Sequence, residues 1–147
     1  MHKCTRMSEL ESENAETLWL MYRRPRMPRA VSHVIVGAVY HPPGADDRAI
    51  SSHILDSLDI VTGDHPYVSA LLAGDFNQLQ DASLLSYPLK QVDKSPTRGS
   101  AVLGKIYTNL QDWYEKPVIL PNIARSDHKA VLMTPTIVTK AEGRILR

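Results

Sequence analysis

The chain has 147 residues and a formal net charge of +1, with 43% hydrophobic and 22% charged residues. These values are typical of one globular domain with a real core; they exclude a disordered chain, and the charge indicates no particular partner. The single cysteine, Cys4, excludes an intrachain disulfide framework and favours a reducing, intracellular location, nuclear or cytoplasmic. We expect neither a membrane nor a secreted protein, because no apolar run approaches the roughly 20 residues that span a bilayer and the N-terminus lacks an apolar signal core.

Residues 15–24 predict a strand that is apolar on both faces. One face would carry Leu18, Leu20 and Tyr22, and the other Trp19 and Met21. The strand runs into a segment with four arginines: Arg23, Arg24, Arg26 and Arg29. This segment could contact a nucleic-acid phosphate backbone, although a solvated loop shaped by its prolines would have the same composition.

The next part of the chain predicts a strand, a helix and a strand in that order. Residues 31–40 are rich in β-branched side chains and are typical of a buried strand. Residues 46–62 predict a helix, because apolar side chains recur at helical spacing and Asp46 or Asp47 can cap its start. Residues 67–74 predict a second buried strand. This order indicates a βαβ unit in an α/β sheet, where ligands bind beyond the carboxyl ends of the strands.

The remaining elements are shorter. The sequence predicts a helical turn at 81–89 and strands at 102–110, 117–121 and 128–138. There is no obvious linker, so we expect residues 1–147 to form one domain. Its ends, 1–16 and 135–147, are polar enough that we expect them to be loosely ordered.

Two short motifs carry chemistry, GDFN after one predicted strand and SDH before another. Asp75 could position or deprotonate a water, and Asn77 could donate a hydrogen bond to a phosphate. Asp127 could hold a divalent ion, and His128 could donate to a phosphate oxygen. Either motif alone is more typical of a turn. Both together in an α/β chain favour a site that hydrolyses a phosphodiester.

The motifs occur in the order AVYHPP, GDFN, PTRG, TNL and SDH. In this order the chain resembles the endonuclease/exonuclease/phosphatase superfamily and, more narrowly, the endonuclease domains of non-LTR retrotransposons. The resemblance implies an α/β fold in which two sheets form a sandwich of the DNase I-like type. It also implies dependence on Mg²⁺ or Mn²⁺ and the nicking of a DNA phosphodiester.

The resemblance also implies roles for six residues. The catalytic ones would be Asp75, Asn77, His128 and Tyr40. Asp127 would lie near the metal, and Arg98 of PTRG would approach the DNA substrate. A tyrosine at a strand end is more often simply half-buried, so Tyr40 alone would indicate little.

Two departures from the family pattern lead us to expect weak activity or none. We expect the chain to begin partway through the family domain, without the N-terminal half that supplies an asparagine and a metal-binding glutamate. Gly104 stands where the family has an aspartate that orients the imidazole. We also expect one face of the sheet to stay bare, because the helix at 46–62 can cover only one.

The sequence therefore favours a truncated endonuclease-like domain of a retrotransposon-derived protein. Its expected partners are DNA and either the missing N-terminal half or a reverse transcriptase module of a longer product. One alternative is a non-catalytic remnant that binds nucleic acid or a protein partner. Another keeps the fold but acts on a phospholipid or inositol phosphate.

Overall fold

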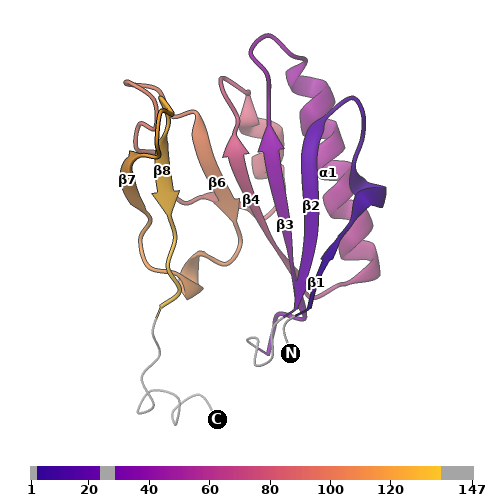
Figure 1. Ribbon diagram of the computed structural model, residues 1–147. Coiled ribbons are helices and arrows are strands. Elements are labelled where there is room, and N and C mark those ends of the chain that lie inside the picture. The colour runs from indigo at the N-terminus through magenta and orange to yellow at the C-terminus, as the bar shows by residue number, and fades with distance from the viewer. Residues whose placement is uncertain (1–2, 24–28, 137–147) are drawn as a thin grey trace, which may run out of the picture.

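The computed structural model describes residues 3–23 and 29–136, which form two sheets and one long helix (Figure 1). The larger sheet has six strands in the order β1-β2-β3-β4-β6-β5. Their bounds are Lys3–Arg6, Glu16–Arg23, His33–Tyr40, Val68–Asp75, Gly104–Thr108 and Lys90–Gln91 in that spatial order. The smaller sheet pairs β7 (Val118–Asn122) with β8 (Lys129–Leu132).

The helices are α1 (Asp47–Asp64) and the short 3-10 turns η1 (Ser8–Leu10), η2 (Asp81–Ser86) and η3 (Gln111–Trp113). None of the helices among the described residues is both long and apolar enough to cross a membrane.

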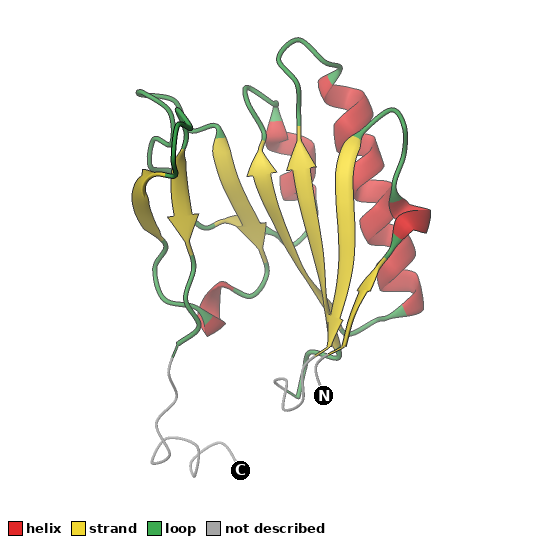
Figure 2. Cartoon of the chain, in the orientation of Figure 1, coloured by secondary structure: helices red, strands yellow, loops and turns green. Residues whose placement is uncertain are grey.

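The predicted βαβ unit is confirmed, since β3 and β4 pair in parallel and α1 connects them. The Asp46 side chain accepts hydrogen bonds from the backbone N–H groups of Arg48 and Ala49, which fixes the start of α1 as predicted. In a parallel pair the carboxyl ends of the two strands lie together, so the loops that follow Tyr40 and Asp75 lie at the same end of the sheet (Figure 2).

The core lies between α1 and one face of the large sheet. One stripe of the helix is buried: Ile50, Ile54, Leu58 and Val61. It packs in one cluster with Trp19, Ile35 and Leu72 from three neighbouring strands. Each such side chain contributes about 1.5–3 kcal/mol when it leaves water, so burial of this layer is a large favourable term in folding.

The opposite face of the large sheet carries apolar side chains that are only half-buried, among them Leu18, Leu20, Val36 and Leu71. Alternation along β2 separates them from the buried Trp19 and Met21, as predicted. In the described part of the chain no helix lies over this face, and the β7–β8 ribbon stands beyond β6 (Figure 1).

The expectation of a loosely ordered start is wrong for residues 3–16. β1 pairs with β2 from Lys3↔Arg23 to Arg6↔Leu20, and Leu10 and Ala15 are buried. The order comes from pairing along the edge of the sheet, which no local pattern reveals. The last strand, β8, is shorter than the predicted 128–138. Residues 137–147, and Arg24 and Arg26 of the arginine segment, lie outside the described residues.

Candidate active site

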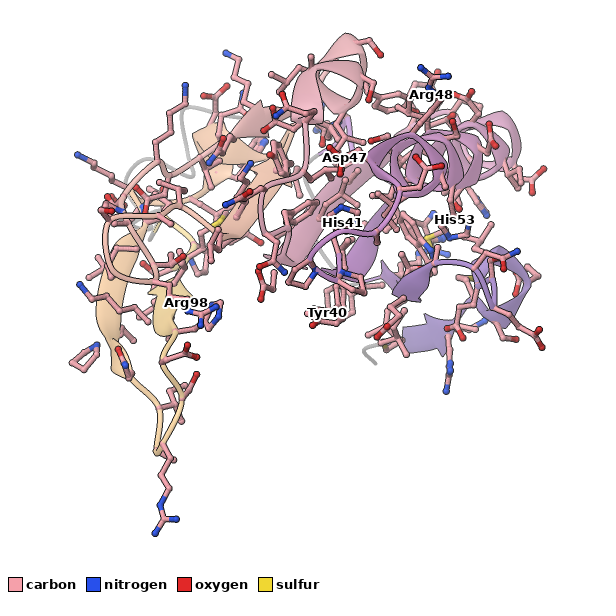
Figure 3. The ribbon with its side chains drawn as sticks, turned by 90° about the horizontal axis from the view of Figure 1, so that it is seen from above. Tyr40, His41, Asp47, Arg48, His53 and Arg98 are labelled. Atoms are coloured by element: carbon pink, nitrogen blue, oxygen red, sulfur yellow. The ribbon has the colours of Figure 1, made fainter. Side chains whose placement is uncertain are left out.

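The ends of three neighbouring strands bring Tyr40, Asp75 and Gly104 into one row. Residues that pair across neighbouring strands point to the same face, so the side chains of Tyr40 and Asp75 share a face of the sheet. Tyr40 is 43% exposed and its ring is therefore accessible to a ligand. Figure 3 looks down on this end of the molecule, with Tyr40 and His41 on one side and Arg98 across from them.

The turn after β4 holds the Asp75 carboxylate in place. The backbone N–H of Asn77 donates to Asp75 Oδ1 at 3.0 Å, and Asn77 has a φ of 45°, which closes the turn tightly. Its side-chain Nδ2 donates to the carbonyl of His41 at 2.6 Å. One N–H of the Asn77 side-chain amide therefore links the loop after β4 to the loop after β3. The second N–H of that amide is the one that could donate to a phosphate.

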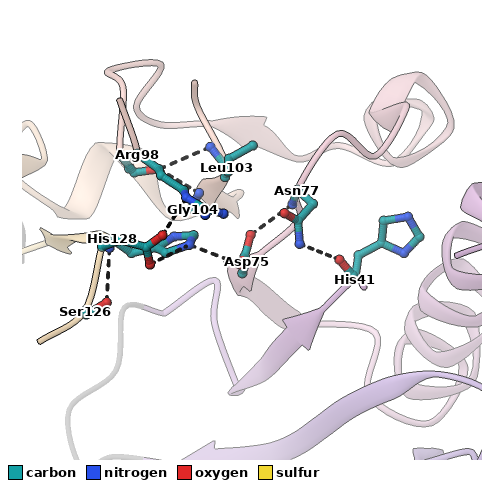
Figure 4. A network of polar contacts seen from close by, with 10 residues as sticks. His41, Asp75, Asn77, Arg98, Leu103, Gly104, Ser126 and His128 are labelled. Atoms are coloured by element: carbon teal, nitrogen blue, oxygen red, sulfur yellow. Dashed lines mark hydrogen bonds and ion pairs between the residues drawn. The ribbon is translucent and has the colours of Figure 1, made fainter. Parts of the chain in front are cut away.

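The two sequence motifs meet at this turn (Figure 4). His128 Nε2 lies 3.6 Å from Asp75 Oδ2 and 3.7 Å from Asp127 Oδ1. The Ser126 hydroxyl accepts from the backbone N–H of His128 at 3.1 Å, which fixes the turn before β8. The imidazole therefore lies between two carboxylates that come from distant parts of the sequence.

Arg98 approaches the same place from a tight hairpin. Its Nε lies 2.7 Å from Asp127 Oδ2, and both side chains are at least half exposed. The backbone N–H of Lys129 donates to the carbonyl of Thr97 at 2.8 Å, so the residues beside this bond, Arg98 and His128, are neighbours. The resemblance implied that Arg98 would approach the DNA substrate, which stays a prediction, but the ion pair with Asp127 was not predicted.

Thr97 is a structural residue of the site that the sequence analysis missed. Its side chain is 1% exposed, and its Oγ1 accepts from the backbone N–H groups of Leu103 at 3.1 Å and Gly104 at 2.8 Å. Thr97 thus ties the hairpin of Arg98 to the start of β6. No signal other than its place in the PTRG motif pointed to it.

His41 and Asp47 form a second structural pair that sequence reasoning missed. The buried His41 donates from Nε2 to Asp47 Oδ1 at 2.8 Å, and the backbone N–H of Gln80 donates to Asp47 Oδ2 at 3.1 Å. The Gln80 bond first, and the His41 bond second, lower the pKa of Asp47 below its ordinary value. The pair joins the loop after β3, the start of α1 and the loop after β4.

The described residues contain no preformed cluster of metal ligands. Among residues 3–23 and 29–136 there is no group of three or more His, Cys, Asp or Glu side chains that could hold a metal ion. The Asp127 carboxylate, expected near the metal, is bound instead by the Arg98 guanidinium. A divalent ion of this kind is held by one or two carboxylates together with waters and substrate phosphates, and here one of the two nearby carboxylates is engaged by a guanidinium.

Gly104 has no side chain, so it offers the His128 imidazole no hydrogen-bond acceptor. A Cβ placed on it would meet the Thr97 side chain at ordinary contact distances, 3.4 Å or more. The carboxylate nearest to His128 Nε2 is therefore Asp75.

Beside these residues is a hollow of about 560 Å³ between the loop 41–45 and the loop 98–103. Its wall includes Asn77 and Arg98.

Comparison with known proteins gives a structural likeness only: no family model and no curated protein matches the chain. The structure is similar to the endonuclease domain of TRAS1, a telomere-specific non-LTR retrotransposon, with a TM-score of 0.63 and 14% identity over 90% of this chain and 66% of that one. It is also similar to a functionally unknown conserved protein from Enterococcus faecalis V583, with a TM-score of 0.53 and 13% identity over 92% of this chain and 66% of that one.

The chain thus spans slightly less than two thirds of the length of each of these proteins. At such identities the likeness concerns the fold. The predicted fold class is confirmed: this is a mixed α/β fold with a six-stranded and a two-stranded sheet, consistent with the DNase I-like type and distantly similar to a retrotransposon endonuclease domain.

Proposed function

We propose that this chain is an endonuclease-like domain that hydrolyses a phosphodiester bond of DNA, and that it does so weakly on its own. The observation that carries the proposal is the approach of His128 Nε2 to within 3.6 Å of Asp75 Oδ2 at the carboxyl ends of β3 and β4. A carboxylate that can accept a proton, beside an imidazole that can donate one, is an arrangement that hydrolysis of a phosphodiester can use.

Each side chain has a separate task in the proposed reaction. The Asp75 carboxylate orients a water and takes its proton as the water oxygen bonds to phosphorus and the P–O bond to the leaving sugar oxygen breaks; that oxygen takes a proton from solvent water. Asn77 keeps the Asp75 carboxylate in position. His128 and Arg98 donate to the non-bridging phosphate oxygens, where negative charge builds in the transition state. The Tyr40 hydroxyl lies on the same face and can donate to the same phosphate.

We propose Mg²⁺ or Mn²⁺ as the activating ion, with Asp127 as one ligand once a phosphate draws Arg98 away. The described residues lack the further ligands, so we expect them to come from outside the described residues or from a partner polypeptide. A reverse transcriptase module or a further part of an endonuclease domain would be such a partner. The half-buried apolar face of the large sheet, which includes Leu20 and Val36, is a surface that such a partner could bind.

The test is the nicking of supercoiled plasmid by the purified chain with Mg²⁺ or Mn²⁺. We expect slow nicking that EDTA stops. Asp75→Ala and His128→Ala should each reduce the rate at least about tenfold, because each removes one half of an acid–base pair. Arg48→Gln is the matched control, since Arg48 is exposed at the start of α1 and should leave the rate unchanged. Equal nicking by all variants would indicate a contaminating nuclease and contradict the proposal.

Gly104→Asp should increase the nicking rate. The new carboxylate would stand in the row of Asp75, where it could accept from the imidazole of His128 and fix its orientation. We expect a gain of about tenfold, the scale on which such orienting partners act. Gly104→Ala is the control, because its Cβ has the same room without an acceptor. A stably folded Gly104→Asp protein that nicks no faster would refute this placement.

The second candidate, a non-catalytic remnant that binds DNA, is favoured by the Arg98–Asp127 pair, in which the guanidinium occupies a carboxylate expected near the metal. DNA retention without nicking by the wild type, weakened by salt, would support it over the enzyme.

A further inference from the structure

The backbone of His41 holds both sides of the turn that carries Asp75 and Asn77. Its N–H donates to the carbonyl of Asp75 at 2.9 Å, and its carbonyl accepts from Asn77 Nδ2 at 2.6 Å (Figure 4). Asn77 has a φ of 45°, a conformation that an L side chain rarely adopts and that persists only where neighbouring bonds hold it. The direction of the Asn77 amide therefore depends on where His41 lies.

The His41 side chain is itself attached to the start of α1. His41 is 3% exposed, and its Nε2 donates to Asp47 Oδ1 at 2.8 Å. A buried N–H needs such an acceptor. Asp47 is the first residue of α1, directly after the Asp46 cap, so the acceptor is carried by a helix that packs on the sheet (Figure 3). His41 thus connects a rigid element to the turn.

The second oxygen of the Asp47 carboxylate holds the far end of the loop 75–80. Oδ2 accepts from the backbone N–H of Gln80 at 3.1 Å. Phe76, between the two attachment points, is fully buried, so the middle of the loop is also fixed. The Gln80 bond first, and the His41 bond second, lower the pKa of Asp47, so its carboxylate is charged at neutral pH and accepts both bonds.

We propose that His41 and Asp47 are positioning residues of the candidate active site. They keep one N–H of the Asn77 amide on the His41 carbonyl, so the other N–H has a fixed direction toward a phosphate. They also keep the Asp75 carboxylate in place, because the backbone N–H of Asn77 bonds to it. Their effect on the rate rests on the proposed function, whereas the fixed direction of the amide is a property of the folded chain.

A positioning role and a purely stabilising role have different consequences. Loss of a bond that only stabilises the fold would lower the stability of the protein and leave Asn77 in place in every folded molecule. Loss of a positioning bond would release the Asn77 amide while the chain stays folded. It would also make the effects of substitutions at Asp47 and Asn77 non-additive, because one residue acts through the other.

The first measurement is the rate at which the Asn77 side-chain amide exchanges protons with water, by NMR on the full chain. The signal is identified by its absence in Asn77→Ala. Asp47→Asn leaves an acceptor for only one of the two N–H donors, and His41→Leu removes the ring N–H. Each should increase the exchange rate about tenfold, the equivalent of one hydrogen bond. His41→Gln keeps an N–H at the position of Nε2 and should keep exchange slow.

The second measurement is the rate of plasmid nicking. Asp47→Asn and His41→Leu should slow the maximal rate at least about tenfold and leave the half-saturating DNA concentration unchanged, because a misplacement of about 1 Å can cost about a hundredfold. In the Asn77→Ala background, Asp47→Asn should cost little. Asp59→Asn is the matched control: it removes an equal charge at an exposed position of α1 and should change neither measurement.

Each result decides the matter. Faster exchange in Asp47→Asn and His41→Leu, with slow exchange kept in His41→Gln, supports the proposal. Unchanged exchange in variants that thermal unfolding shows to be folded overturns it, and so does an equal loss of rate from Asp47→Asn in the Asn77→Ala background. A wild type that never nicks contradicts the proposed function instead, and the exchange rates then still decide whether His41 and Asp47 fix the Asn77 amide.

Discussion

Gly74→Ala is expected to remove a large part of the free energy of unfolding. Gly74 has a φ of 155°, and a Cβ built on it would lie 1.8 Å from the carbonyl oxygen of Val39. That oxygen belongs to the backbone of the adjacent central strand, so it cannot move aside without breaking the β3–β4 pairing. We expect a loss of about 4 kcal/mol or more, at the extreme of single substitutions. A domain has only about 5–15 kcal/mol of stability in total.

Gly63→Ala is the matched control for that substitution. Gly63 lies in the last turn of α1, and a Cβ there would meet nothing within 4 Å. Alanine should be neutral or should stabilise the helix by up to about 1 kcal/mol. Urea unfolding followed by circular dichroism gives both values. A Gly74→Ala protein as stable as Gly63→Ala would show that β3 and β4 do not approach as closely as the structure indicates.

Thr97→Val is expected to destabilise the protein by about 2–4 kcal/mol, although valine has the same shape. The change removes Oγ1, which accepts from the backbone N–H groups of Leu103 and Gly104 in a nearly closed environment. A buried donor left without an acceptor costs about 1–3 kcal/mol. The hairpin would also lose its tie to β6, so Arg98 would leave its place beside Asp127.

Thr97→Ser separates the hydroxyl from the methyl group. Serine keeps the acceptor and loses one methyl, so we expect a cost of about 1 kcal/mol. The two variants are compared by urea unfolding, and any nicking activity should persist in Thr97→Ser and fall in Thr97→Val. Similar stability of the two would mean that the Thr97 hydroxyl is not the tie between the hairpin and β6.

The central elements could be predicted because their signals are local. Val31 to Tyr40 is a dense run of β-branched residues, and α1 repeats its apolar side chains every three or four positions. These patterns fix which face of each element is buried. β1 could not be predicted, because its short polar sequence at residues 3–6 becomes a strand only through pairing with β2.

The candidate site was predicted in part. Asp75, Asn77, Asp127 and His128 were visible as motifs, and the structure brings the two motifs together. The ion pair of Arg98 with Asp127 was not visible, since it depends on the Lys129–Thr97 backbone bond between distant segments. Spacing along a sequence carries no information about such a bond.

The sequence by itself determined the α/β order, the buried faces and the types of side chain in the two motifs, because each follows from residue type and local periodicity. Only the tertiary structure decided which side chains lie next to those groups. It placed His128 between Asp75 and Asp127, gave Asp127 a guanidinium partner, and tied the turn after β4 to His41 and Asp47. The physical reason is that strand register, fixed by pairing over long sequence distances, sets which side chains become neighbours.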